Sequence, residues 1–267
     1  MDNNKFSEVT VVAIHGKGDI KNHLPSLNWN RQNLPGSHGL IVSNIKLSDD
    51  EIKDNDFLLL PDEMNLDQYQ DFMIYCLHRH IYTDFALTVQ SDGWILNKDN
   101  WNDVFFDFDY IGAPTHAALC NGIFYRFYEW WGKQNPLVVQ NGGFSLRSKN
   151  FLEAPSRYGV FKHLCDFPEL NNEDVQLSCF MRPTLERLGF RYAPIEVARL
   201  FSFEHLHPVM HENLDIKKIF GQPSRFRELT DSYKMLWKMP DEVFNKIAWE
   251  DKVLDLFKHY NYEISTT

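Results

Sequence analysis

Short apolar runs alternate with helix-forming stretches along the first half of the chain, and this alternation constrains the fold more than any other feature. Between two of the runs, Asp67–His80 carries apolar side chains at helical spacing. Alternating strands and helices predict an α/β fold, a sheet with helices on both faces. The predicted strands are Val9–Ile14, Gly39–Ser43, Asp56–Leu60, Asp84–Gln90, Tyr110–Ala113, Leu137–Gln140 and Phe190–Pro194.

The second half of the chain is predicted to be richer in helices. One helix follows Asn172, and two more are expected at Ser224–Lys238 and Pro240–Tyr260, the last opening with Pro-Asp-Glu. A chain of 267 residues fits one large domain with an appendage. We therefore predict a main domain over residues 1–212 and a C-terminal helical extension over residues 213–267, packed on the same domain.

Composition narrows the class of protein. The formal net charge is -10 and no block of Lys or Arg interrupts it, which disfavours a nucleic acid partner. No apolar stretch approaches the ~20 residues of a transmembrane helix, and the N-terminus does not resemble a secretory signal. The four cysteines form no CxxC pair, so reduced thiols are expected. A cytoplasmic location is predicted, peripheral membrane association stays open, and the oligomeric state is not predicted.

An acid stands directly after the fourth predicted strand, in Gln90-Ser91-Asp92-Gly93. Ligands of open α/β sheets bind beyond the carboxyl ends of the strands. A carboxylate at that place can hold Mg²⁺ or Mn²⁺ together with substrate phosphate oxygens. The alternative is a turn aspartate that accepts hydrogen bonds from nearby backbone amides.

Two more segments follow predicted strands. The first, Ala13 to Asp19, contains His15, Lys17 and two glycines, but it lacks the P-loop pattern and can equally be a simple turn. The second is Asn141-Gly142-Gly143, expected to end its strand in a tight bend with exposed backbone amides.

Acidic and imidazole side chains supply further candidates. Glu173 and Asp174 open a predicted helix, where they can either complement the helix dipole or provide a general base. Clustered histidines can bind metals, although the irregular spacing of His205, His207 and His211 also suits a surface loop. One of the three could add a ligand to an ion at Asp92.

Taken together, QSDGW, DYIGAP, NGGFSLR, NNEDVQLS and FSFEH resemble a GT-A type nucleotide-sugar-dependent glycosyltransferase. The resemblance is to a group of bacterial and viral domains of unassigned specificity, and it covers about residues 8 to 210. Its Gly-Gly and Glu-Asp segments also resemble those of inverting β-galactosyltransferases. The resemblance implies a GT-A (Rossmann-like) mixed central sheet flanked by helices.

The resemblance also implies a role for each motif residue. Asp174 would be the catalytic base, beside Glu173, and a metal ion would bind Asp92 and His205, with His207 and His211 as alternatives to the histidine. The implied donor-binding residues are Ala13, His15, Lys17, Gln90, Ser91, Asp92 and Gly93. The implied acceptor- or sugar-binding residues are Trp94, Asn141, Gly142 and Gly143.

The activity implied is transfer of a sugar from a nucleotide-sugar donor, UDP-sugar first among the choices, to a hydroxyl of a glycan, with inversion and a Mn²⁺ or Mg²⁺ cofactor. Gln90 replaces the first acid of the Asp-x-Asp motif of these enzymes, and the loss of one carboxylate ligand lowers the expected affinity for the metal ion. Two alternatives are an inactive GT-A-shaped carbohydrate-binding or scaffolding protein and a metal-dependent phosphohydrolase. The second needs more converging ligands than the sequence places.

Overall fold

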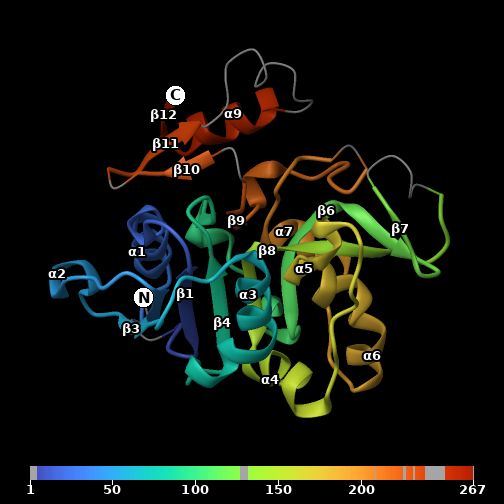
Figure 1. Cartoon of the computed structure of the whole chain (residues 1–267). Helices are drawn as coiled ribbons and strands as arrows, with labels where there is room; N and C mark the ends of the chain where they lie inside the picture. Colours follow the sequence, from blue (N-terminus) through green and yellow to red (C-terminus); the bar gives the residue numbers. More distant parts are fainter. Residues whose placement is uncertain are drawn as a thin grey trace.

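The computed structural model describes residues 5–126, 132–207, 209–224, 227–230, 232–237 and 250–266. Its centre is a seven-stranded mixed sheet in the order β3-β2-β1-β4-β8-β6-β7 (Figure 1). The strands of this sheet are β1 (Val9–His15), β2 (His38–Ser43), β3 (Asp56–Leu59), β4 (Phe85–Val89), β6 (Tyr110–Cys120), β7 (Ile123–Tyr125) and β8 (Leu137–Ser148).

The first four strands run parallel, whereas β8 is antiparallel to both β4 and β6. The predicted α/β class and the mixed sheet flanked by helices are therefore confirmed. The helices of this part are α1 (Leu24–Asn33), α2 (Asp49–Ile52), α3 (Leu66–Asp71), α4 (Lys149–Tyr158), α5 (Glu173–Val175), α6 (Arg182–Arg187) and α7 (Ile195–Phe201).

Alternation along β1 explains why helices cover both faces of the sheet. Val11 and Ala13 face a core that includes Leu27 of α1 and Phe201 of α7. Val12, on the opposite face, packs with Met73, Leu77 and Leu152, which come from the helical stretch after α3 and from α4. Successive residues of a strand point to opposite faces, so a run that is apolar throughout must be buried on both sides.

Several predicted boundaries change in the structure. The Asp67–His80 helix is present as α3 followed by a π-helical turn, Phe72–Cys76, and a 3₁₀ turn. The helix expected after Asn172 is divided into α5, a second π-helical turn and α6. The strand predicted at Phe190–Pro194 is wrong: only Tyr192 pairs with the sheet, through one bridge to Tyr110.

The C-terminal part contains a second, small sheet. The helix predicted over Ser224–Lys238 is wrong, because this stretch holds β10 (Arg227–Leu229) and β11 (Lys234–Trp237), which join β12 (Glu263–Thr266) in the order β10-β11-β12. Of the second predicted helix, α9 (Glu250–His259) is observed, and residues 240–249 lie outside the described residues. In the described part of the expected helical extension, α9 therefore accompanies a three-stranded sheet. The domain boundary at residue 212 stays a prediction.

Trp94 anchors this C-terminal sheet to the main one. It belongs to β5 (Trp94–Ile95), which pairs with β9 (Gly221–Gln222), and its ring is fully buried. The indole lies 5.7 Å from the ring of Phe257 and 5.0 Å from that of Tyr262, centroid to centroid. Figure 1 shows β10, β11 and α9 at the top of the molecule, above the ends of the strands of the central sheet. Within the described residues, no helix is both long and apolar enough to cross a membrane.

We expect Trp94→Ala to lower the free energy of unfolding by about 3–5 kcal/mol, because it removes a fully buried indole from the cluster that packs α9 and the C-terminal sheet. Trp94→Phe is the matched control. It keeps an aromatic ring, and the indole Nε1 that it deletes has no hydrogen-bond partner among the described residues. Urea unfolding measures both variants. An Ala variant as stable as the Phe variant would contradict the anchoring role.

Candidate functional site

A polar cavity of about 280 Å³ lies where β4 ends. Val89, the last residue of β4, pairs with Phe144 of β8, and the Gln90 amide donates to the Gly143 carbonyl at 2.9 Å. The segment after β4 and the centre of β8 therefore lie side by side. The cavity is lined by Leu66, Tyr69, Gln70, Gln90, Asp92, Asn141, Gly142, Gly143, Asn172, Glu173, Asp174, Glu204, Pro223 and Ser224.

Two glycines allow this close approach. A Cβ on Gly142 would lie 2.1 Å from Glu173 Oε1, and a Cβ on Gly143 would lie 2.8 Å from Gln90 Oε1. The strand end predicted at Asn141-Gly142-Gly143 is wrong, since β8 continues to Ser148, although its pairing with β6 is irregular across these residues. The glycines serve here to leave space for neighbouring polar side chains, rather than to turn the chain.

A buried ion pair forms the floor of the cavity. Arg147 Nη2 lies 2.9 Å from Oε1 and 3.1 Å from Oε2 of Glu173, and the two side chains are 0% and 6% exposed. The guanidinium also donates to Ser145 Oγ at 3.0 Å and lies over the ring of Tyr110. Burial opposes the charge of Arg147, but the Glu173 carboxylate keeps the pKa of the guanidinium above its ordinary value.

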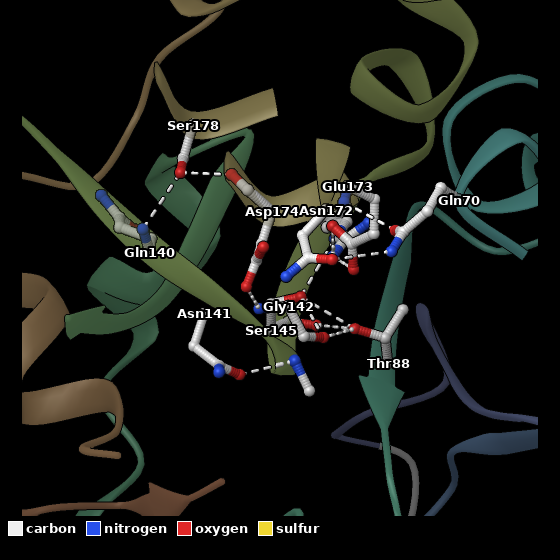
Figure 2. A network of polar contacts seen from close by, with 12 residues as sticks. Gln70, Thr88, Gln140, Asn141, Gly142, Ser145, Asn172, Glu173, Asp174 and Ser178 are labelled. Carbon is white, nitrogen blue, oxygen red and sulfur yellow. Dashed lines mark hydrogen bonds and ion pairs between the residues drawn. The ribbon is translucent and has the colours of Figure 1, made fainter. Parts of the chain in front are cut away.

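Helix α5 is fixed over this floor by amide side chains. Gln70 accepts a hydrogen bond from the backbone N–H of Glu173 at 2.6 Å and donates one to Asn172 Oδ1 at 3.1 Å. Ser178 Oγ donates to the carbonyl of Asp174 and accepts from the backbone N–H of Gln140. Figure 2 shows Asp174 of α5 and Thr88 of β4 directed toward Gly142 of β8, with Gln70, Asn172 and Glu173 grouped beside them. The Glu173-Asp174 pair is thereby held between two elements.

Asp174 is the titratable group of the site. Its Oδ2 accepts from the Gly142 amide at 3.2 Å and its Oδ1 from the Val175 amide at 2.8 Å. Burial and, after it, the neighbouring Glu173 carboxylate raise the pKa of Asp174 to about 7, against the two amides and Arg147. A carboxyl group in this state exchanges a proton near neutral pH, as a general base requires.

Helix α1 holds the turn that carries Asp92, a contact that the sequence did not reveal. Asn30 is fully buried; its Nδ2 donates to the Gly93 carbonyl at 2.9 Å, and its Oδ1 accepts from the Ile95 amide at 2.8 Å. Ser26 Oγ also donates to the Gly93 carbonyl. A Cβ on Gly93 would lie 2.5 Å from the Gly143 carbonyl oxygen. These contacts fix Asp92, which is 8% exposed, in the cavity wall.

The predicted donor-binding residues are only partly brought together. Gln90, Asp92 and Gly93 meet at the cavity, and Ser91 Oγ donates to Glu228 of β10 at 3.1 Å. The segment after β1 lies outside the cavity lining. Its Ala13 is fully buried in the core, its His15 ring packs 4.6 Å from that of His23, and its Lys17 is exposed.

The predicted acceptor residues are divided in the same way. Asn141, Gly142 and Gly143 line the cavity, and Asn141 Oδ1 accepts from the Gly143 amide at 2.6 Å. Trp94 does not, because its ring is buried between the two sheets, where it offers no surface to a sugar. We therefore leave Trp94 out of the site.

The three histidines lie outside the cavity lining. The ring of His205 lies 6.0 Å from that of His116. His207 Nδ1 accepts from the Val209 amide, and His211 Nδ1 accepts from the His207 amide, which explains the spacing as a hydrogen-bonded turn. Burial lowers the pKa of both His207 and His211 to about 4.

The side chains present define how a cation could be held. Among the described residues, no group of three or more His, Cys, Asp or Glu side chains is arranged to bind a metal ion. Asp92 and Glu204 do line the same cavity. One or two carboxylates completed by substrate phosphates and water is the usual environment of Mg²⁺ in proteins. The residues therefore fit an ion that arrives with a phosphorylated ligand, and they do not fit a closed protein cage.

Comparisons with known proteins give one family and two slight structural similarities. The model of a family described as "Protein of unknown function (DUF5672)" matches residues 56–221. A search of curated proteins finds no match. Among solved structures, S. aureus TarS 1–349 in complex with UDP has 13% identity and a TM-score of 0.36, and the match covers 64% of this chain and 53% of that one.

A second structure of S. aureus TarS 1–349 has 12% identity and a TM-score of 0.36, over 65% of this chain and 54% of the other. The chain thus spans about half the length of the TarS structures it matches. Similarity at this TM-score assigns neither fold nor function, so the architecture here is read from the strand order and the packing of the chain itself.

The raised pKa of Asp174 has a consequence for stability. The folded-state pKa of about 7 lies above the ordinary aspartate value of 3.8, so the ionised carboxylate is disfavoured in the folded protein. The contribution of Asp174 to the free energy of unfolding is greatest below pH ~4. It decreases by up to about 4 kcal/mol as the pH rises to about 7. Asp174→Asn, which cannot ionise, should lack this fall. Its melting temperature relative to wild type should therefore rise between pH 4 and 7.

Thermal melts of both proteins across this range test the assignment. Asp166→Asn, a change of the same kind in an exposed position, is the control and should follow the wild type. A difference between Asp174→Asn and wild type that stays constant with pH would show that the Asp174 carboxyl has an ordinary pKa.

Proposed function

The chain belongs to the DUF5672 family of proteins of unknown function, and we propose that it is a glycosyltransferase that moves a sugar from a nucleotide-sugar donor to a hydroxyl group of a glycan. The observation that carries the proposal is Asp174, a carboxyl group with a pKa of about 7 in the wall of a polar cavity beyond the end of β4. The motifs that resemble GT-A enzymes provide further support.

The cavity suits a ligand rich in hydroxyl groups. Its lining is dominated by carboxylate, amide and hydroxyl side chains and by the backbone of Asn141-Gly142-Gly143. Few apolar side chains line the cavity, whereas the usual pocket for an apolar small molecule is lined mainly by hydrophobic and aromatic side chains. Amide and carboxylate groups provide the donors and acceptors that sugar hydroxyls need. A sugar ring bound between Gln90 and Asp174 would contact amide and carboxylate groups on both of its faces.

A single general base in the cavity is consistent with sugar transfer by direct displacement. Asp174, ionised, takes the proton of the acceptor hydroxyl as that oxygen forms a bond to the anomeric carbon of the donor sugar. The bond between the anomeric carbon and the diphosphate oxygen breaks at the same time, and the nucleoside diphosphate leaves with the electron pair. Displacement from the opposite face inverts the anomeric configuration. Glu173, paired with Arg147, adds to the effect of burial in raising the pKa of Asp174.

Charge balance requires a cation for such a donor. Four acids line the cavity, and no Lys, Arg or His stands among the described residues that line it. A nucleoside diphosphate carries negative charge into these surroundings, so its binding there needs a compensating ion. Mn²⁺ or Mg²⁺ held by Asp92 and the diphosphate would supply Lewis-acid stabilisation of the leaving group. His205 lies outside the cavity lining, and phosphate and water oxygens would take its place as ligands of such an ion.

Asp174→Asn should abolish sugar transfer, with a loss of at least about 10²-fold in kcat, because the acceptor proton has no other acceptor at that position. In the wild type, kcat/KM should rise with pH and level off above about 7, where Asp174 is ionised. Release of nucleoside diphosphate from a panel of sugar nucleotides measures both effects.

Asp166→Asn, in an exposed position, is the control and should turn over normally. Normal turnover by Asp174→Asn would contradict the assignment of the base. Binding of a sugar nucleotide by the wild type with no transfer or hydrolysis would favour the carbohydrate-binding alternative.

Asp92→Asn should weaken the binding of nucleoside diphosphate in the presence of Mn²⁺ and should not weaken the binding without metal, where loss of a negative charge reduces repulsion. The reason is that the substitution removes a carboxylate ligand of the ion but no contact to the nucleotide itself. Isothermal titration with UDP, with and without Mn²⁺, gives both affinities. Asp99→Asn, outside the cavity lining, is the control. An equal Mn²⁺ enhancement in wild type and Asp92→Asn would exclude Asp92 as a metal ligand.

A further inference from the structure

The segment between α4 and α5 displays large apolar side chains to solvent. Phe161 is 77% exposed, Leu164 87% and Phe167 67%, and Tyr158 at the end of α4 is 48% exposed. Single exposed apolar residues are common on protein surfaces, but a run of this kind in one segment marks an interaction site. The cavity and its acids lie on other residues, so the segment has no part in the chemistry proposed above.

These side chains are exposed although the backbone that carries them is fixed. The His163 amide donates to Gln176 Oε1 at 2.7 Å, and Gln176 Nε2 donates back to the His163 carbonyl at 2.9 Å. Asn171 makes the same reciprocal pair with the amide and carbonyl of Cys165, both at 3.1 Å. The Lys162 amide donates to the Tyr75 hydroxyl at 2.9 Å.

Each backbone contact involves a residue between the apolar ones. The chain is thus held by its polar groups on the inner side, and the side chains of Phe161, Leu164 and Phe167 are directed outward by the fold. They gain little burial within the chain. An ordered loop that keeps its largest apolar groups in water is built for contact with another apolar phase.

Arginines surround one end of this segment. Arg157 lies over the ring of Tyr158 at 5.5 Å, and Tyr158 contacts Phe190 edge to face at 6.4 Å. Phe190 is next to Arg191 in the chain, and exposed Leu188 is next to Arg187. Arg157, Arg187 and Arg191 are all exposed. Asp166 and Glu169 are exposed within the segment, so the positive charge is confined to the end at Tyr158, where Arg157 and Arg191 favour an anionic partner.

We propose that this surface, made of Tyr158, Phe161, Leu164, Phe167 and Leu188 with Arg157, Arg187 and Arg191, binds an anionic lipid membrane peripherally. The apolar side chains enter the boundary between headgroups and acyl chains, and the arginines contact lipid phosphates. A protein partner is the lesser fit. A stable protein interface covers about 800 Å² on each side with matching pockets, whereas these side chains project separately from one narrow segment. A membrane accepts separate side chains without matching pockets.

Vesicle sedimentation tests the proposal with the full chain. Vesicles of equal parts phosphatidylserine and phosphatidylcholine should bind the wild type, vesicles of phosphatidylcholine alone should bind it much more weakly, and added salt should release it. The triple change Phe161→Ser, Leu164→Ser and Phe167→Ser should weaken binding at least ~tenfold, since it removes the side chains that insert.

Two further variants keep the test independent of folding. Leu164→Ser alone changes the most exposed of the three side chains and should weaken binding measurably with an unchanged melting temperature. Tyr82→Ser is the matched control, because Tyr82 is 81% exposed at another place on the surface and should not affect binding. The proposal is overturned if the wild type does not bind phosphatidylserine vesicles, or if the triple variant binds them as well as the wild type does. It is equally overturned if the triple change acts only by dissociating a dimer in gel filtration.

Discussion

The ion pair between Arg147 and Glu173 is the interaction on which the rest of the site depends. It joins the end of β8 to the start of α5, in a place where neither side chain reaches bulk water. Removing one member of such a pair leaves a buried charge, at a cost of about 3–5 kcal/mol. The pair also fixes the Glu173 carboxylate beside Asp174. Asp174 then ionises only against burial and a neighbouring negative charge, which is the reason for its raised pKa.

The glycines of β8 leave the space that this ion pair occupies. A side chain at Gly142 would occupy the position of the Glu173 carboxylate, and it would also lie 2.9 Å from Arg147 Nη2. Gly142 also donates its amide to Asp174, so one residue without a side chain serves both acids. Electrostatics and packing thus impose the same requirement on this position. That agreement explains why a Gly-Gly pair stands inside β8, at the place where its pairing with β6 is irregular.

The architecture of the central sheet was predictable because its strands are buried on both faces. Their apolar runs show in the sequence without knowledge of their partners, and β1 to β4 begin and end within about a residue or two of the predicted bounds. The C-terminal strands were missed for the opposite reason. In β11, only the alternation of buried Met235 and Trp237 with half-buried Lys234 and Leu236 marks a strand, and four residues also suit a helix.

The acidic residues of the site were predictable from the sequence, but the side chains that hold them in place by hydrogen bonds were not. Asp92, Glu173 and Asp174 stand after a strand or at a helix start, where local pattern suffices to nominate them. Asn30 and Gln70 fix the Asp92 turn and the Glu173 amide, yet each lies far away in sequence and has the composition of an ordinary helix residue. The burial of Trp94 was not predictable, because an aromatic residue beside a ligand loop has the same sequence signature whether it faces a cavity or packs in a core.

The central claim is that the chain keeps a carboxyl group half-protonated near neutral pH inside its cavity. Carbon-13 NMR of the protein labelled at aspartate carboxyl groups measures this directly, with Asp174→Asn identifying the resonance. The Asp174 signal should titrate with a midpoint near 7. A midpoint near the ordinary aspartate value of about 4 would contradict the claim, and with it the role of the Arg147–Glu173 pair in preparing a base.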